Sequence, residues 1–121
     1  MYMIRIIRRD TKSKRAIRTR SRVRGSAKVP RLTVFRSNRY IYAQLVDDDT
    51  GRTMASSSSL SLLEREKGKT KKEISFDVGL EISQKAKSQG IEKIVFDKGP
   101  YKYHGLIKEL AEGARKGGLN F

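Results

Sequence analysis

Charge is distributed very unevenly along this chain, and the imbalance limits which residues can form a hydrophobic core. Residues 1–39 contain 14 Lys and Arg against one acidic residue, whereas residues 40–121 contain 14 Lys and Arg against 12 acidic residues. Nearly all of the net charge of +15 therefore lies in the first third of the 121 residues. Because charged side chains are seldom fully buried, the core must be built mainly from the remaining two thirds.

Apolar residues are scarce in the basic part of the chain. Only four of the residues between positions 8 and 28 are apolar. So few apolar side chains cannot offset the entropy that is lost when a segment becomes ordered. We therefore predict a basic arm over residues 1–29, flexible when free, followed by a single α/β domain over residues 30–121.

A β-hairpin is predicted directly after the arm. Strands over residues 32–35 and 40–46 flank Ser37 and Asn38, two residues that are common in turns. A two-residue loop pairs the last residue of the first strand with the first residue of the second. Since side chains alternate along a strand, one face of the hairpin is aliphatic and is assigned to the core. The opposite face carries Thr33, Phe35, Tyr40 and Tyr42.

A turn, an edge strand and a loop are predicted after the hairpin. Residues 47–51 have the composition of a turn, and their three acidic residues are interpreted as solvated because the spacing of a calcium loop is absent. A more polar strand over residues 53–56 is expected at the sheet edge. The serines 56–59 lead into the charged residues 64–72, which are interpreted as a loop, and a linker role is favoured over a phosphorylation cluster.

Two helices and one strand are predicted in the last part of the chain. Thr70 and Glu73 have the spacing of a capping box, which places a helix start there, and Gly90 is a suitable helix end. The apolar run within residues 91–96 favours a buried parallel strand, and a final helix is expected over roughly residues 104–116. The fold class is thus α/β: a three-stranded antiparallel meander, then a βαβ-type parallel strand placed centrally, then a C-terminal helix.

The segment over residues 96–105 follows the predicted parallel strand and precedes the last helix. Ligands tend to bind at the carboxyl ends of strands in α/β sheets, and a helix start offers backbone N–H groups to an anion. A tight connector with half-buried tyrosines is the alternative interpretation. The charged and aromatic candidates in this loop are Lys98, Tyr101, Lys102, Tyr103 and His104.

The sequence contains no signature of a catalytic or metal-binding site. There is no cysteine and only one histidine, which excludes disulfides and Cys-based metal sites. Neither the hydrolase, zinc-protease nor phosphate-loop patterns occur. We therefore expect no enzyme activity, no metal and no cofactor. No apolar run approaches the ~18 residues of a membrane span or forms a secretory signal, although an Arg- and Ser-rich start is also typical of organellar transit peptides.

The remaining features favour binding to structured RNA. A strongly positive protein attracts polyanions, and tyrosines on a strand face suit unstacked bases, which are more typical of RNA than of duplex DNA. A lipid surface is disfavoured because the arm lacks an apolar stripe. The candidate RNA contacts are Arg15, Arg18, Arg20, Arg22, Arg24, Arg31, Arg36, Ser37, Asn38, Arg39, Tyr40, Tyr42, Lys98, Tyr101, Lys102, Tyr103 and His104.

Three stretches of the chain resemble signatures of a known family. They are PRLTVFRSNRYIYAQ at residues 30–44, GIEKIVFDKGPYKYHG at residues 90–105 and AEGARKGGLNF at residues 111–121. In order and spacing they are similar to the large-subunit ribosomal protein eighteen family, bacterial type. The chain departs from the family pattern at Lys98 and Pro100, where Arg and Gly are usual.

The resemblance implies a structural constituent of the large ribosomal subunit. Such a protein binds 5S rRNA and helps attach it to the large-subunit rRNA in the central protuberance. The implied partners are these two RNAs and neighbouring ribosomal proteins, with no membrane contact and a monomer when free. The implied location is the cytoplasmic ribosome, and an organellar ribosome of bacterial descent stays open. A non-ribosomal module that binds structured RNA is the alternative function.

Overall fold

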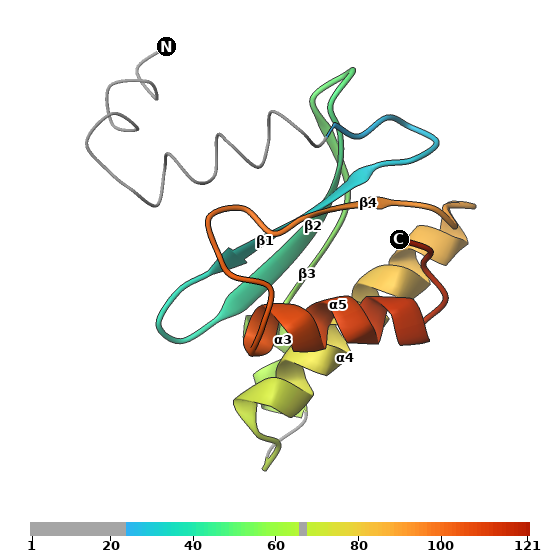
Figure 1. Cartoon of the computed structure of the whole chain (residues 1–121). Coiled ribbons are helices and arrows are strands. Elements are labelled where there is room, and N and C mark those ends of the chain that lie inside the picture. Colours follow the sequence, from blue (N-terminus) through green and yellow to red (C-terminus); the bar gives the residue numbers. More distant parts are fainter. Residues whose placement is uncertain (1–23, 66–67) are drawn as a thin grey trace.

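The computed structural model describes residues 24–65 and 68–121 (Figure 1). The elements are β1 (Arg31–Arg36), β2 (Ile41–Asp47), β3 (Arg52–Ser58), α3 (Ser59–Arg65), α4 (Lys71–Ser88), β4 (Val95–Asp97) and α5 (Leu106–Lys116). The strands form one sheet in the order β3-β2-β1-β4, in which only β4 runs parallel to its neighbour. The predicted α/β fold, with its antiparallel meander, parallel strand and C-terminal helix, is confirmed. Residues 1–23 of the predicted arm lie outside the described residues.

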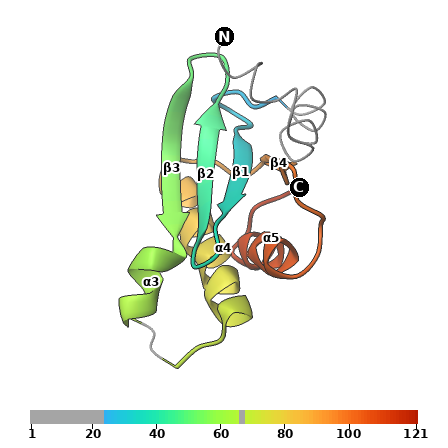
Figure 2. The same ribbon diagram turned by 90° about the vertical axis from the view of Figure 1, so that its left-hand side faces the viewer.

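The sheet and two helices form two layers. Helices α4 and α5 pack against each other on one side of the sheet (Figures 1 and 2). The aliphatic face of the hairpin lies against them, so that Leu32 and Leu45 are fully buried. Helix α4 contributes a stripe of apolar residues spaced four apart, as an amphipathic helix requires. The stripe consists of Ile74, Val78, Ile82 and Ala86, all of which are buried.

Two glycines allow the backbones of α4 and α5 to approach closely. A Cβ atom on Gly79 would overlap the carbonyl oxygen of Leu110, and one on Gly113 would overlap the carbonyl oxygen of Phe76. Both obstacles are backbone atoms of the opposite helix, which cannot rotate away as a side chain can. The distance between the two helices is therefore set by the absence of side chains at these two positions.

Both predicted ends of α4 are confirmed. The Thr70 Oγ1 accepts a hydrogen bond from the Glu73 N–H at 3.2 Å, which satisfies one of the free donors of the first turn. At the other end Gly90 has a φ of 76° and donates its N–H to the Lys87 carbonyl oxygen at 3.0 Å. Among the described residues, no helix combines the length and the apolar character needed to cross a bilayer.

The prediction of a central parallel strand is wrong. Strand β4 has three residues and lies at the sheet edge, beside β1. Just before β4 the chain runs alongside the C-terminal segment instead. The Ile94 N–H donates to the Asn120 carbonyl oxygen at 3.1 Å, and the Asn120 N–H donates to the Glu92 carbonyl oxygen at 2.9 Å. The buried Ile91 and Ile94 therefore reflect packing under the chain terminus rather than a strand between two others.

Helix α3 is not predicted by the sequence pattern, and its last two residues, 64 and 65, are the first two of the predicted loop. Its Leu62 is buried in the core, and its first residue, Ser59, accepts the Ile41 N–H at 2.9 Å. A seven-residue helix is too short to show a helical repeat of apolar residues, because it completes only two turns. This is why the sequence pattern did not reveal it.

Candidate nucleic-acid interface

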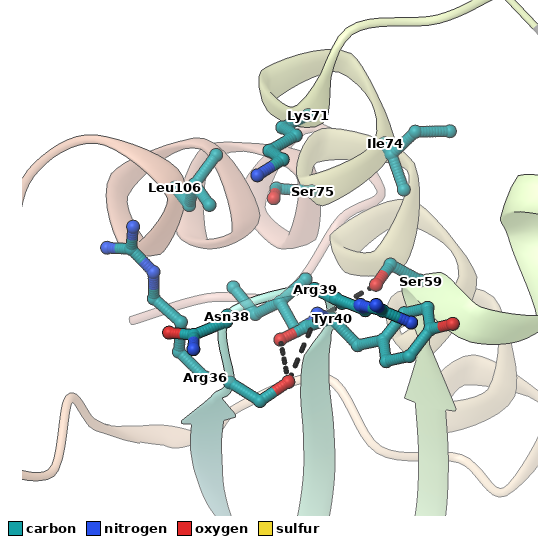
Figure 3. Close-up of a pocket in the computed structure, with 11 residues that line it drawn as sticks. Arg36, Asn38, Arg39, Tyr40, Ser59, Lys71, Ile74, Ser75 and Leu106 are labelled. Atoms are coloured by element: carbon teal, nitrogen blue, oxygen red, sulfur yellow. Dashed lines mark hydrogen bonds between the residues drawn. The ribbon is translucent and has the colours of Figure 1, made fainter.

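Ser37 closes the turn at the end of the β1–β2 hairpin. Its N–H donates to the Tyr40 carbonyl oxygen at 2.8 Å, and its Oγ accepts the Tyr40 N–H at 3.1 Å (Figure 3). The turn is therefore centred on Asn38 and Arg39, one residue later than the sequence predicted. The Ser37 hydroxyl accounts for the difference. Ser37 is the residue before the two central turn residues, and its hydroxyl accepts the N–H of Tyr40, the residue after them. Arg36 and Arg39 are both exposed.

The later turn changes the strand register by two residues. Phe35 pairs with Tyr42, whereas the predicted loop would have paired it with Tyr40. A shift by an even number of residues leaves every side chain on its predicted face of the sheet. The predicted register is thus wrong, and the predicted division into an aliphatic and an aromatic face is confirmed.

An aromatic cluster occupies the face of the sheet that the helices leave open. The ring centres of Phe35 and Tyr42 are 5.9 Å apart, and those of Tyr42 and Tyr40 are 6.4 Å apart. Phe35 is 57% exposed, which is unusual for a large apolar side chain on a strand. The sequence-based candidate RNA contacts include the tyrosines of this face but not Phe35. Its position on the alternating strand was the signal that could have identified it.

Tyr101 links the 98–105 loop to the hairpin. Strand β4 pairs only with residues 31–33 of β1, and beyond that point the Tyr101 hydroxyl takes over the contact with the β1 backbone. It accepts the Arg36 N–H at 3.0 Å and donates to the Arg36 carbonyl oxygen at 3.2 Å. Residues 36–40 and 98–105 therefore form one continuous region, which we call the hairpin–loop surface.

The loop itself is folded by its own hydrogen bonds. The Asp97 Oδ1 accepts the Gly99 N–H at 2.8 Å, and the Lys98 Nζ donates to the Tyr101 carbonyl oxygen at 3.1 Å. Lys98 is thus half-buried and partly engaged, whereas Lys102 and His104 are exposed. Helix α5 begins at Leu106, two residues after the predicted start at His104.

Tyr103 belongs to a different cluster, near the C-terminus. Its ring contacts Phe96 edge to face at 5.8 Å, and its hydroxyl accepts a hydrogen bond from the Arg115 Nη1 at 3.0 Å. The Arg115 guanidinium in turn lies 4.3 Å from the centre of the Phe121 ring. Tyr103 remains 40% exposed, and although its backbone belongs to the hairpin–loop surface, its side chain contacts Phe96 and Arg115.

Arg31 is buried and is not an accessible cation. Its Nε and Nη2 donate to the two carboxylate oxygens of Asp48 at 3.0 Å each, and its Nη1 donates to Asp97 at 2.6 Å. The bonds from Arg31, reinforced by the Gly25 N–H at 2.7 Å, hold the pKa of Asp48 below its ordinary value despite the opposing effect of burial. Asp48 likewise raises the pKa of Arg31. Arg31 therefore stabilises the fold, and we remove it from the candidate RNA contacts.

Two of the three acids in the turn after β2 have structural roles. Asp47 is buried and accepts hydrogen bonds from the Asp49 N–H and the Thr50 Oγ1, both at 3.0 Å. Asp48 binds Arg31, as described above. The prediction of solvated acids is wrong for Asp47 and Asp48, whose carboxylates accept hydrogen bonds from backbone, hydroxyl and guanidinium donors, whereas Asp49 is exposed as expected. Within the described residues no group of three potential metal ligands occurs.

The described end of the arm lies at the opposite end of the sheet from the hairpin. Arg24 is exposed and forms an ion pair with Asp49 at 2.9 Å, and Gly25 accepts the Asp48 N–H at 3.2 Å. The length of β1 separates the two regions by about 20 Å at ~3.3 Å per residue. The other predicted arm contacts, Arg15, Arg18, Arg20 and Arg22, lie outside the described residues.

The cations of the hairpin–loop surface have no acidic partners in the part of the chain that the structure describes. Arg36, Arg39 and Lys102 are exposed and form no ion pair there, whereas Lys69 binds Asp77 at 2.7 Å. Like charges gathered without counter-charges create a positive field at this end of the sheet. The arrangement suits a polyanion.

Comparison with known proteins identifies relatives over nearly the whole chain. The model of the family described as ribosomal L18 of archaea, bacteria, mitochondria and chloroplast matches residues 6–121. The large ribosomal subunit protein uL18 of Porphyromonas gingivalis is 51% identical over 96% of this chain and 99% of its own length. The uL18 protein of Thermotoga neapolitana is 48% identical over 96% and 100%, and that of Chlamydia pneumoniae is 46% identical over 91% of each chain. With a chain-length family match and relatives at this level of identity, the chain belongs to the uL18 family of large ribosomal subunit proteins.

Proposed function

We propose that this member of the uL18 family binds 5S rRNA and helps attach it to the large-subunit rRNA in the central protuberance. Family membership gives it a structural role in the large ribosomal subunit, and its bacterial relatives fit a ribosome in the cytoplasm. The binding to 5S rRNA and the attachment in the central protuberance go beyond family membership and constitute our proposal. Neighbouring ribosomal proteins are further expected partners, and the free protein is expected to be a monomer.

The observation that most supports the proposal is the link between Tyr101 and Arg36. It joins two basic segments, more than 60 residues apart in sequence, into one surface. The cations of this surface form no ion pairs with carboxylates of the described residues. Lys and Arg side chains bind the phosphates of a folded RNA, and each such contact contributes roughly 0.7–0.9 to the slope of log affinity against log salt. A surface fixed in shape before binding also loses little entropy when it meets a matching RNA.

The open aromatic face suits the second kind of contact. Phe35, Tyr40 and Tyr42 present rings next to the cationic hairpin tip. Unpaired bases stack on such rings, with about 1–3 kcal/mol per stacked base. We propose that the tip contacts phosphates while a splayed base of a loop or bulge contacts the rings. The arginines of the basic arm would then provide a second contact.

A competition experiment tests this function. The purified full-length protein is titrated with labelled 5S rRNA at increasing salt, in the presence of an unlabelled structured RNA of equal length. We expect a preference for 5S rRNA that persists at raised salt. Salt weakens the attraction between the cations and the phosphates, but it does not remove the recognition of RNA shape. Equal competition by both RNAs at every salt concentration would overturn the proposal and favour a general structured-RNA binder.

A further inference from the structure

A small pocket lies between the hairpin tip and the two long helices. Its volume is about 40 Å³, and since roughly 10–15 Å³ suffices for one water, it accommodates a group about the size of three waters. The hairpin forms one wall, the first two turns of α4 form the other, and the start of α5 borders it (Figure 3). The side chains that matter for the argument are Arg36, Arg39, Lys71, Ser75 and Leu106.

The charged lining of this pocket is positive only. Arg36 and Arg39 line it from the hairpin and Lys71 from the first residue of α4, and no Asp or Glu of the described residues is among the lining residues. Within the residues that the structure describes, none of these three cations forms an ion pair with a carboxylate. Figure 3 shows the two arginine side chains on either side of the hairpin tip, so an anion at the tip lies within the field of both.

Two helix starts also border the pocket. Helix α4 contributes its first turns through Lys71 and Ser75, and α5 contributes its first residue, Leu106. Gly105, which precedes α5, provides no side-chain hydrogen bond to the first turn. The first N–H groups of a helix have no partner within the helix, and its dipole places partial positive charge there. Both helices therefore add to the attraction for an anion.

A largely buried hydroxyl also lines the pocket. Ser75 is only 1% exposed and is one of the lining residues. Figure 3 shows its oxygen on the pocket side of α4. A hydroxyl can donate a hydrogen bond, and an anion oxygen in the pocket would accept it.

We propose that this pocket binds one phosphate group of the RNA backbone. In the proposed complex Lys71 and the hairpin arginines supply charge, Ser75 donates a hydrogen bond, and the helix starts orient the phosphate. The inference rests on the proposed RNA-binding function and assigns two further residues, Lys71 and Ser75, which lie outside the three stretches that resemble family signatures. Lys71 and Ser75 belong to α4, whereas Arg36 and Arg39 belong to the hairpin. A phosphate in the pocket would therefore contact both the helix layer and the hairpin tip.

The first test compares Lys71→Ala with Lys72→Ala. Both lysines are exposed in the first turn of α4, but only Lys71 lines the pocket. We expect Lys71→Ala to weaken binding to 5S rRNA roughly ten-fold, as for one lost charged hydrogen bond, and to reduce the salt slope by about 0.7–0.9. Lys72→Ala should leave both quantities near the wild-type values. Equal losses for the two variants would overturn the pocket while leaving the 5S rRNA preference of the wild-type protein, and hence the proposed function, intact.

The second test does not depend on RNA. Inorganic phosphate is titrated into the free full-length protein while backbone amide signals are followed by NMR. We expect saturable shifts at residues 71–75 and 106, reduced several-fold in affinity by Ser75→Ala, with the melting temperature of that variant checked in parallel. Shifts spread evenly over the basic surface, or unchanged in Ser75→Ala, would show that the pocket is not a phosphate site.

Discussion

The Tyr101 hydroxyl bridges the two backbone polar groups of Arg36, accepting from the N–H at 3.0 Å and donating to the carbonyl oxygen at 3.2 Å. Strand β4 pairs with β1 only as far as Thr33. At Arg36 the Tyr101 hydroxyl therefore makes the backbone hydrogen bonds that a neighbouring strand would otherwise make. The contact positions a cation-bearing residue through its backbone and leaves the guanidinium free to bind. The hairpin tip and the loop after β4 consequently behave as one surface.

Removing this hydroxyl should loosen the surface without unfolding the protein. We expect Tyr101→Phe to lower the free energy of unfolding by about 0.5–1.5 kcal/mol, the usual net value of a hydrogen bond. Hydrogen exchange at the Arg36 amide should accelerate. Tyr103→Phe, which loses a bond to Arg115 instead, serves as the control and should leave Arg36 exchange unchanged. Unaltered Arg36 exchange in Tyr101→Phe would mean that the bridge does not restrain the hairpin.

Removing Arg31 should be far more damaging, because it leaves two carboxylates without their cation. Asp97 is only 1% exposed, and breaking a buried ion pair at one partner typically costs about 3–5 kcal/mol. We expect Arg31→Met to lose stability in that range in urea denaturation, and the double variant with Asp97→Asn to recover part of it. A loss below about 1 kcal/mol for Arg31→Met would contradict the structural role and return Arg31 to the candidate RNA contacts.

The same network predicts a loss of stability in acid. Bonds from Arg31 hold the pKa of the Asp48 carboxyl in the folded protein below its ordinary value of 3.8. Protonation therefore favours the unfolded chain: the stabilisation is complete well above pH 3.8 and is lost as the pH falls through that value toward the folded-state pKa. We expect the free energy of unfolding of Asp48→Asn to fall less steeply than that of the wild-type protein in this range.

The matched control for the acid prediction is Asp49→Asn. Asp49 lies in the same turn, but its side chain is 58% exposed and binds the exposed Arg24. This variant should follow the wild-type dependence on pH. If Asp48→Asn and Asp49→Asn gave the same curve, the Arg31–Asp48 contact would not be the source of the acid sensitivity.

A methyl group at the crossing of α4 and α5 should force the helices apart. Gly→Ala normally stabilises a helix interior by about 1 kcal/mol, but at Gly79 or Gly113 the new Cβ meets a backbone carbonyl oxygen. We expect each variant to lose about 1–3 kcal/mol in thermal or urea unfolding. Glu112→Ala, at an exposed position of α5, should stay within about 0.5 kcal/mol of the wild-type protein. A stabilised Gly113→Ala variant would show that the helices have room to separate.

The elements that the sequence predicted correctly are those with local signals. The capping box at Thr70, the helix end at Gly90 and the alternation of the hairpin each involve residues within a few positions of one another. The cationic tip with Arg36 and Arg39 could be recognised for the same reason. The turn centre was off by one residue because the decisive bond comes from the Ser37 side chain, which composition alone does not orient.

The features that the sequence did not reveal depend on contacts between distant residues. Arg31 could not be separated from the exposed arginines, because its partner Asp97 lies 66 positions away. The edge position of β4 depends on the chain terminus near Asn120, and the pocket at Lys71 and Ser75 depends on how α4 packs beside the hairpin. Helical spacing identifies the buried face of α4 but not what that face meets.

The most direct test of the RNA-binding account is a salt-dependent titration of 5S rRNA with the wild-type protein and with Arg36→Ala/Arg39→Ala. The account predicts affinity reduced roughly 10- to 100-fold, a slope of log affinity against log salt smaller by about 1.4–1.8, and an unchanged melting temperature, since both side chains are exposed. Unchanged affinity and slope would contradict a phosphate-binding hairpin tip. A large fall in the melting temperature would instead make the two arginines part of the fold.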